Sequence, residues 1–344
     1  MNRKVTICDI ARAAGVSACS VSWVLRSHPR SKGLNENTKQ RILEAASHLG
    51  YVQNLLAAAT RTGQVNTIAL IGNFLKIQSF HPSSQIIAGI MTESSARHFG
   101  VKIFDENTLE LSFRQIVENR IDKVISLSVD PLLREKTAIL AEKLGTRLIF
   151  CYEHGNGKYP AVNTDNREMS AKGVHYLARH GHTRIGLLCV PHLTFHAKDR
   201  HAGYLQGMEE CNLKVDPAWV SCSGEDEKKI QSILSLPKRR RPTAFMAHSD
   251  LIAACAQRAA WKMGLRIPEE LSVIGIGDTK VARGAIVPIT TFREGYPATG
   301  KMLVRLVLGE KPELVPDEYN VYRTHAELIE RESVFPIKKA GDTA

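Results

Sequence analysis

The sequence predicts an all-α head followed by an α/β core that contains two parallel-sheet, Rossmann-like subdomains. Residues 5–49 hold three short stretches in which apolar side chains recur at helical spacing. From Thr67 onward, short and continuous apolar runs alternate with helical patterns. Such alternation is typical of parallel sheets covered by helices on both faces. At 344 residues the chain also exceeds what one hydrophobic core usually organises, which favours two or three domains.

The head is predicted to be a helix-turn-helix followed by a third helix. Thr6 can cap the first helix, and Asp9 completes a near capping box. Gly15 supplies the left-handed residue of the turn, and Ser17 caps the second helix. Helices this short are stable only when they pack together. The side chains expected in their shared core are Ile7, Ile10, Ala11, Val21, Val24, Leu25, Ile42, Leu43, Ala46 and Leu49.

Positive charge is concentrated in the head. The whole chain has a formal charge of +11. Residues 1–63 contain nine Lys and Arg against three Asp and Glu, a difference of +6, so more than half of the excess lies in under a fifth of the chain. This asymmetry favours a polyanionic partner over a generally basic protein.

The core is expected to alternate strands and helices. Strands are expected at residues 68–72, 102–105, 123–128, 147–152, 185–190, 243–248 and 272–277. Helices are expected at residues 83–99, 111–119, 131–144, 166–180, 198–212 and 249–263. After Phe335 the tail has no apolar heptads, so we expect it to be disordered and to form no coiled coil.

The composition disfavours several classes of protein. No apolar run approaches the length of a membrane span, and no signal peptide is expected at Met1. The seven cysteines are scattered, odd in number and without a CxxC pair, which suits a reducing cytoplasm and disfavours zinc. No cofactor or metal is expected, because Gly275 and Gly277 form a lone GxG and no carboxylate cluster joins His180 and His182.

Two groups of motifs resemble the lactose/galactose-repressor family of bacterial transcription regulators. In the head they are TICDIARAAGVSACSVSWVL and NENTKQRILEAASHLGYVQN. In the core they include VNTDNREMSAKGVHYLARHGHTRIGLL, RHAGYLQGM and PTAFMAHSDLIAACAQRAAWKMGLRIPEELSVIGIGD, in the family's order. The resemblance covers nearly the whole chain and implies a periplasmic-binding-protein-like core. The implied parts are a DNA-binding head (1–50), a hinge helix and linker (51–64), a core (65–337) and a tail (338–344). Within the core, the N-subdomain takes about 65–160 plus 291–322, and the C-subdomain about 161–290 plus 323–337.

The resemblance also implies which head residues contact DNA. Ser17 and Ser22 are expected to hydrogen-bond phosphates, and Thr6 belongs to the same surface. The residues expected to face base edges in the major groove are Ala18, Cys19 and Trp23. Relatives usually carry Arg where Trp23 stands, and an indole cannot bond guanine in bidentate fashion, so we expect an unusual operator. The alternative is that Trp23 belongs to the core and the helix is rotated.

The implied hinge helix is expected to fold when two copies meet on DNA. Leu56 and Ala57 would pack one hinge against the other, while Asn54 and Arg61 would meet phosphates or the minor-groove edge. Thr60 replaces a leucine that kinks the duplex in many relatives. We therefore expect a smaller bend in bound DNA.

The cleft between the core subdomains is the implied effector site. Arg200, within RHAGY, is expected to hold ligand oxygens, unless it is a surface arginine at a helix start. Asp250 is either a ligand contact or the cap of the following helix. The implied effector residues are Phe80, Pro82, Tyr152, Phe195, Arg200, Ser249, Asp250 and Asp278.

Departures from the family pattern bear on the effector. Gly277 replaces an aspartate, and Ser249 an asparagine, that are common in relatives. The cleft also gains Lys198, His192 and His196, so it becomes less acidic. An effector that is more anionic or less hydroxylated than a plain sugar is therefore expected.

Together these features predict a sequence-specific DNA-binding transcriptional regulator. A repressor is favoured over an activator, because a compact dimer on a promoter blocks polymerase without added contacts. The expected partners are double-stranded operator DNA, a small-molecule effector (a carbohydrate or an anionic metabolite) and a second copy of the chain, with no membrane. The expected location is the bacterial cytoplasm, at the nucleoid. An enzyme is disfavoured, and a secreted sugar-binding protein would need a signal peptide and would lack residues 1–63.

Overall fold

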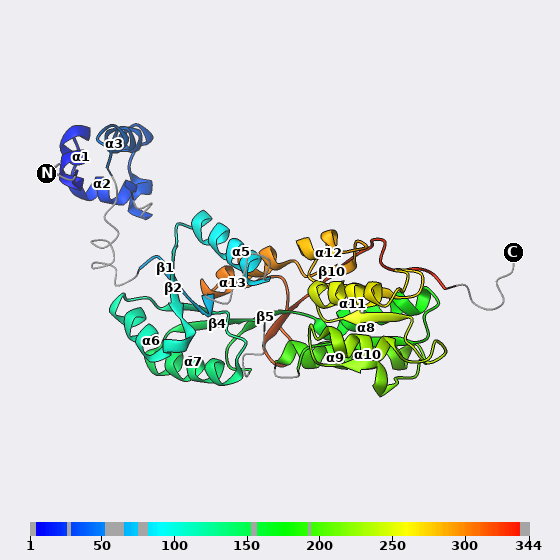
Figure 1. Cartoon of the computed structure of the whole chain (residues 1–344). Helices are drawn as coiled ribbons and strands as arrows, with labels where there is room; N and C mark the ends of the chain where they lie inside the picture. The colour runs from blue at the N-terminus through cyan, green and yellow to red at the C-terminus, as the bar shows by residue number, and fades with distance from the viewer. Residues whose placement is uncertain are drawn as a thin grey trace. The chain divides into compact units, whose positions relative to one another are not determined.

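The chain divides into two compact units, Met1–Val65 and Asn66–Ala344. The computed structural model describes residues 5–25, 29–51, 65–74, 82–152, 157–191 and 194–337. Figure 1 shows an all-helical first unit and a second unit in which helices cover two separate sheets. The predicted fold class is therefore confirmed.

The first unit is a small three-helix head. Its elements are α1 (Ile7–Ala14), α2 (Ala18–Leu25), the 3₁₀ turn η1 (Pro29–Gly33) and α3 (Glu36–His48). The capping box at α1 is present, since the Thr6 hydroxyl accepts the Asp9 amide and the Asp9 carboxylate accepts the Thr6 amide at 2.9 Å. Asn35 caps α3, as its side chain accepts a backbone amide at 2.7 Å. These local signals explain why short segments become helical here.

Few side chains make the core of the head. Its buried members are Ile10, Ala11, Ala14, Val21, Ile42 and Ala46. The expectation that Leu43 joins them is wrong, because Leu43 is 52% exposed. Adjacent helical residues point about 100° apart, and Ile42 already faces inward. The head therefore depends on a small number of well-buried residues.

The second unit contains two six-stranded sheets within the described residues. The first has the order β11-β5-β4-β3-β1-β2, with parallel pairings throughout. Its strands are β1 (Thr67–Gly72), β2 (Gly100–Asp105), β3 (Lys123–Ser126), β4 (Arg147–Cys151), β5 (Ala161–Thr164) and β11 (Val321–Thr324). The second has the order β12-β10-β9-β8-β6-β7, parallel except for the antiparallel pair β10 and β12. Its strands are β6 (Ile185–Leu188), β7 (Val220–Ser221), β8 (Ala244–Ala247), β9 (Ser272–Ile276), β10 (Thr290–Arg293) and β12 (Glu327–Ile329).

Helices pack on each sheet and define two lobes. The first lobe has η3 (Glu106–Thr108), α5 (Pro82–Ala96), α6 (Leu109–Glu118), α7 (Pro131–Leu144) and α13 (Tyr296–Val307). The second lobe has α8 (Asn166–Arg179), α9 (Phe195–Glu210), η4 (Pro217–Trp219), α10 (Glu227–Leu234), α11 (Asp250–Lys262) and α12 (Lys280–Gly284). Because helices cover both faces of each sheet, the inner strands β1, β4, β6, β8 and β9 are nearly continuous in apolar residues.

The chain passes between the lobes three times. It leaves the first sheet after β5, returns after β10 through α13, and leaves again between β11 and β12. The helices α13 and α5 then pack closely, because a Cβ on Gly300 would stand only 2.1 Å from the Ile86 carbonyl oxygen. Glycine is required at that contact.

All seven predicted strands are confirmed, with ends within two residues of those expected, and all six predicted core helices with ends within three. The elements not predicted are β5, β7, β10, β11, β12, α10, α12 and α13.

Candidate functional site

The turn between α1 and α2 exposes the start of α2. Gly15 ends α1 with φ of 62°, and the Ser17 hydroxyl accepts a backbone amide of α2 at 3.1 Å. Arg41 on α3 donates to the Ala14 carbonyl and ties the third helix to this turn. The exposed residues at the start of α2 are Ser17, Ala18 and Cys19. A surface rich in amide N–H groups with positive neighbours suits a phosphate backbone.

Two further residues on α2 differ from their expected exposure. Ser22 is only 7% exposed, so in this conformation its hydroxyl lies inside the head rather than at a DNA-facing surface. Trp23 is partly buried, and the Arg30 guanidinium lies 5.8 Å from the centre of its ring. Trp23 is therefore neither a fully buried core residue nor a fully exposed side chain that faces base edges, so neither alternative is fully met. Its pairing with Arg30 adds a cation beside the indole.

Several predicted site residues lie outside the described part of the chain. In the hinge these are Asn54, Leu56, Ala57, Thr60 and Arg61, and in the core they are Phe80 and His192. Pro82 is the first residue of α5, and its side chain is not described. Thr6 is described and exposed, and its hydroxyl donates to Asp9 at 2.6 Å.

Arg200, on α9, is 8% exposed and makes three hydrogen bonds to the protein. Nε donates to Asn166 Oδ1 at 2.7 Å, and Nη1 donates to the His248 carbonyl at 2.6 Å. Nη2 donates to Glu294 Oε1 at 3.1 Å. These acceptors come from the start of α8, from just after β8 and from just after β10. The alternative of a surface arginine is therefore wrong.

Glu294 and Tyr296 extend this cluster toward the first lobe. The Tyr296 hydroxyl donates to Glu294 Oε2, and both residues are buried. The Tyr152 hydroxyl lies 2.9 Å from Ser83 Oγ. Burial, reinforced by Glu294, raises the pKa of Tyr296 well above 10.0. The pKa of Tyr152 is likewise raised, chiefly by burial. Both tyrosines are therefore neutral hydrogen-bonding groups at neutral pH.

Sequence reasoning missed Glu294 and Tyr296. A signal was available, because Glu294 directly follows the β-branched and aromatic residues of β10, and polar groups that bind ligands gather at the carboxyl ends of parallel strands.

Ser249 and Asp250 have roles in the fold. Ser249, not Asp250, caps α11, since its hydroxyl accepts the Ile252 amide at 3.3 Å. Asp250 is buried and accepts the Thr279 amide at 2.7 Å and its hydroxyl at 2.8 Å, as well as the Thr291 hydroxyl. Burial raises the pKa of Asp250 although these bonds oppose it.

The GxG at Gly275 is explained by packing against Asp250. A Cβ on Gly275 would stand 2.5 Å from Asp250 Oδ1. The glycine therefore permits a close approach of α11 to β9.

Asp278 is enclosed by arginines. Arg293 donates to it at 2.8 Å, Arg331 also donates to it, and Arg283 lies 3.5 Å away. Burial would raise the pKa of Asp278, but the bonds from Arg331 and Arg293 outweigh it and lower the pKa. Since its oxygens already have these partners, Asp278 is poorly placed as a hydroxyl acceptor for a ligand.

The start of α9 presents the remaining candidates. Phe195 is partly exposed, and Lys198 Nζ lies 5.6 Å from the centre of its ring. The His196 ring centre is 5.4 Å from that of His248, whose carbonyl accepts Arg200. Of these side chains, His196 thus stands near the Arg200 cluster.

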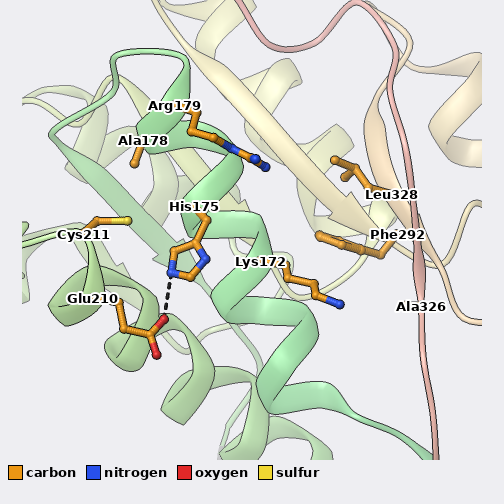
Figure 2. Close-up of a pocket in the computed structure, with 9 residues that line it drawn as sticks. All are labelled: Lys172, His175, Ala178, Arg179, Glu210, Cys211, Phe292, Ala326 and Leu328. Atoms are coloured by element: carbon orange, nitrogen blue, oxygen red, sulfur yellow. Dashed lines mark ion pairs between the residues drawn. The ribbon is translucent and has the colours of Figure 1, made fainter.

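A separate groove lies on the other side of α8, away from Arg200. Figure 2 shows Lys172 and Arg179 on α8 directed toward the segment that carries Ala326 and Leu328. His175 forms an ion pair with Glu210 at 2.8 Å. The groove has a volume of about 880 Å³, and none of its lining residues belongs to the predicted effector set.

The described residues contain neither a clustered metal site nor a single membrane-spanning helix. Among the described residues, no group of three or more His, Cys, Asp or Glu is arranged to hold a metal. His180 instead lies 2.8 Å from the Tyr176 carbonyl, and His182 bonds Thr243 and Phe335. No single described helix has the length and apolarity needed to cross a bilayer; only α1 and α2 taken together do, and they are bent by 107°.

Known proteins resemble both units. Residues 6–54 match the family described as bacterial regulatory proteins, lacI family, and residues 174–334 match the periplasmic binding protein-like domain. The transcriptional repressor PurR of Aliivibrio fischeri is 27% identical, over 96% of this chain and 98% of that protein. The transcriptional repressor CytR of Escherichia coli K12 is 27% identical, over 89% of each chain.

Solved structures share the fold. The lac repressor dimer bound to operator and the anti-inducer ONPF has a TM-score of 0.72 at 22% identity, covering 97% of this chain and all of that one. The CelR–cellobiose complex has a TM-score of 0.68 at 22% identity, covering 96% and 100%. The head with its exposed α2, the two-lobed core and these matches agree with one another. The chain belongs to the lacI family of bacterial regulatory proteins, and it is a DNA-binding transcription regulator rather than an enzyme.

Proposed function

We propose that the protein is a transcriptional repressor that binds a near-palindromic operator as a homodimer and responds to a small molecule held at Arg200. The observation that carries the proposal is the exposed start of α2 on a head with a charge excess of +6, attached to a two-lobed core. Paired heads of this kind read successive major grooves. PurR and CytR are both named as transcriptional repressors, which supports repression rather than activation.

The DNA-reading residues are proposed to be those predicted from the sequence, with two adjustments. Ser22 needs a small rearrangement to reach a phosphate, because it is buried. Trp23 is proposed to act with Arg30, so that the indole packs on sugars or thymine methyls while the guanidinium meets a phosphate. The hinge residues between 52 and 64 keep their proposed roles.

The effector is proposed to be a carbohydrate or a related hydroxylated metabolite. Hydroxyl and amide groups surround Arg200, and cellobiose is bound in the CelR structure that shares this fold. The case for an anionic effector is weaker than the sequence indicated, because Arg200 already pairs with a carboxylate. Ligand binding that shifts the lobes would alter DNA affinity through linkage.

Exposed apolar side chains on α11 support the proposed homodimer. Leu251 and Trp261 are both exposed, Trp261 by 63%, and their ten-residue spacing puts them about 80° apart around the helix axis, within one broad face. Ile286 adds a third exposed apolar side chain nearby, across a groove that includes Ala254. A second copy would cover these groups. The residue limits predicted for head, hinge, core and tail, and a bacterial cytoplasmic location, belong to the same proposal.

Selection of bound sequences from random duplex DNA tests the proposed function directly. Full-length wild-type protein is compared with Trp23→Ala and with Leu43→Ala, which removes an exposed apolar residue from α3 of the same head. We expect a palindromic site for the wild type, a changed preference for Trp23→Ala and an unchanged one for Leu43→Ala. Failure of the wild type to enrich any sequence would refute the proposal. Survival of the same preference in Trp23→Ala would refute only the role given to Trp23.

A further inference from the structure

The ion pair between Arg200 and Glu294 is the most enclosed charged contact of the proposed effector site. The two side chains are 10% and 5% exposed, and Nη2 lies 3.1 Å from Oε1. Oε2 accepts the Tyr296 hydroxyl, so both carboxylate oxygens are engaged. Both charges are held in place by further bonds, to Asn166 and His248 on the arginine side.

The pair is electrically neutral as a unit. The other groups bonded to it are an amide, a backbone carbonyl and a tyrosine hydroxyl, none of which is charged. The carboxylates of Asp250 and Asp278 are already bonded to threonines and arginines of the second lobe. An anion that approached Arg200 would therefore meet Glu294 on the same guanidinium, within about 4–6 Å, where like charges repel strongly because water is scarce.

Hydrogen-bonding capacity for a neutral ligand remains. The guanidinium has five N–H groups, of which the described contacts use three. Asn163, which is 4% exposed, accepts from Asn166 through Oδ1, and its Nδ2 has no partner among the described residues. A buried unpaired amide donor is costly unless something accepts from it. A hydroxyl or ether oxygen of an uncharged ligand would do so.

We propose that Glu294 determines the charge of the effector: it acts as the internal counter-ion of Arg200, so that the site accepts uncharged hydroxylated molecules and rejects small anions such as sugar acids and sugar phosphates. This inference rests on the proposed function, because it concerns the ligand of the same site. It departs from the anionic effector that the sequence alone favoured.

The test uses sulfate as the probe, which avoids the need to know the effector. Binding of radiolabelled sulfate to full-length protein is measured by equilibrium dialysis at constant ionic strength. Glu294→Gln keeps the size of the side chain and removes its charge, which frees Arg200 for an external anion. We expect Glu294→Gln to bind sulfate at least about tenfold more tightly than the wild type. The gain should vanish in Arg200→Gln/Glu294→Gln, in which both charges are absent.

Two controls separate the possible outcomes. Arg179→Gln in the Glu294→Gln background removes an exposed arginine of the groove in Figure 2 and should leave the gain intact. The double variant contains no unpaired buried charge, so it should fold even if Glu294→Gln, which leaves Arg200 without its counter-ion, does not. Sulfate binding by the wild type that the double variant loses would overturn the proposal. So would a folded Glu294→Gln that gains no affinity. The proposed function is judged separately, since the same preparations are assayed for operator enrichment.

Discussion

Acidification should weaken the second lobe through His182. This imidazole is 1% exposed, with Nδ1 3.0 Å from the Thr243 hydroxyl and Nε2 3.1 Å from the Phe335 carbonyl. The neutral ring satisfies both contacts, by accepting at Nδ1 and donating at Nε2. Burial lowers the pKa of His182 from 6.5 to about 4, although the bond to Phe335 opposes the shift. The ring therefore stays neutral in the folded protein at pH values where the unfolded chain is already protonated.

The size of the effect follows from the two pKa values. Because the folded pKa is depressed, the stabilisation is complete above pH 6.5 and is lost as the pH falls toward 4. The difference between 6.5 and 4 corresponds to about 3.4 kcal/mol in total, and about 2 kcal/mol of it is lost at pH 5. His182 joins β8 to the C-terminal segment, so the loss should be felt across this lobe.

Denaturant unfolding between pH 7.5 and 5 measures this dependence. The fluorescence of Trp219, which is buried in the second lobe, reports the transition. We expect His182→Gln to be less stable at pH 7.5 but to lose about 2 kcal/mol less than the wild type on going to pH 5. His98→Asn, an exposed histidine at φ of 58°, is the matched control. Equal acid losses in wild type and His182→Gln would show that this reasoning is mistaken.

Three further predictions concern packing and charge. Ile42→Ala should cost the head about 2–5 kcal/mol, abolishing operator binding in gel shifts while the thermal transition of the core is kept; retained binding would contradict the small-core description. Gly300→Ala should lower the melting temperature of the core, at a cost of about 1–3 kcal/mol, because its Cβ would collide with the Ile86 carbonyl; an unchanged melting temperature would count against this contact. The pKa of Glu93 is lowered below 4.5, chiefly by its bond from Arg305. Its stabilisation is therefore present above that value and lost as the pH falls through the folded pKa. On acidification Glu93→Gln should lose less of its free energy of unfolding than the wild type, and equal losses would refute the assignment.

The parts of the fold that sequence reasoning recovered are those with strong local signals. The strands buried on both faces are continuous apolar runs, and helices such as α7 begin after a capping aspartate and end at a left-handed glycine. The strand β5 was not predicted because half of its residues are polar, and they are polar because β5 ends at the Arg200 cluster. The helix α13 was not predicted because it contains Gly300, a poor helix former that is required for the close packing of α5. Tertiary contacts overrode local preference at both places.

The site was recovered only in part for a similar reason. Arg200 stands in a recognisable motif, but its partner Glu294 lies 94 residues further on, and only the place of β10 in the second sheet brings them together. Ser249 and Asp250 were predicted to contact the effector because of the sequence motif around them. In the structure Ser249 caps α11, and Asp250 accepts hydrogen bonds that hold α11 in place. Burial of Ser22 depends on how three short helices meet, which no local pattern encodes.

The threefold passage of the chain between the lobes limits how the protein can be taken apart. Neither lobe is a continuous stretch of sequence, since the first needs α13 and β11 from beyond β10, and the second ends with β12. A nonsense mutation between β10 and β11 would remove the edge strand of both sheets at once, so it should yield a degraded product rather than a half-active fragment. For the same reason, reporter strategies that split a gene into two complementing pieces should fail at the boundary between the lobes and should be attempted instead between the head and the core.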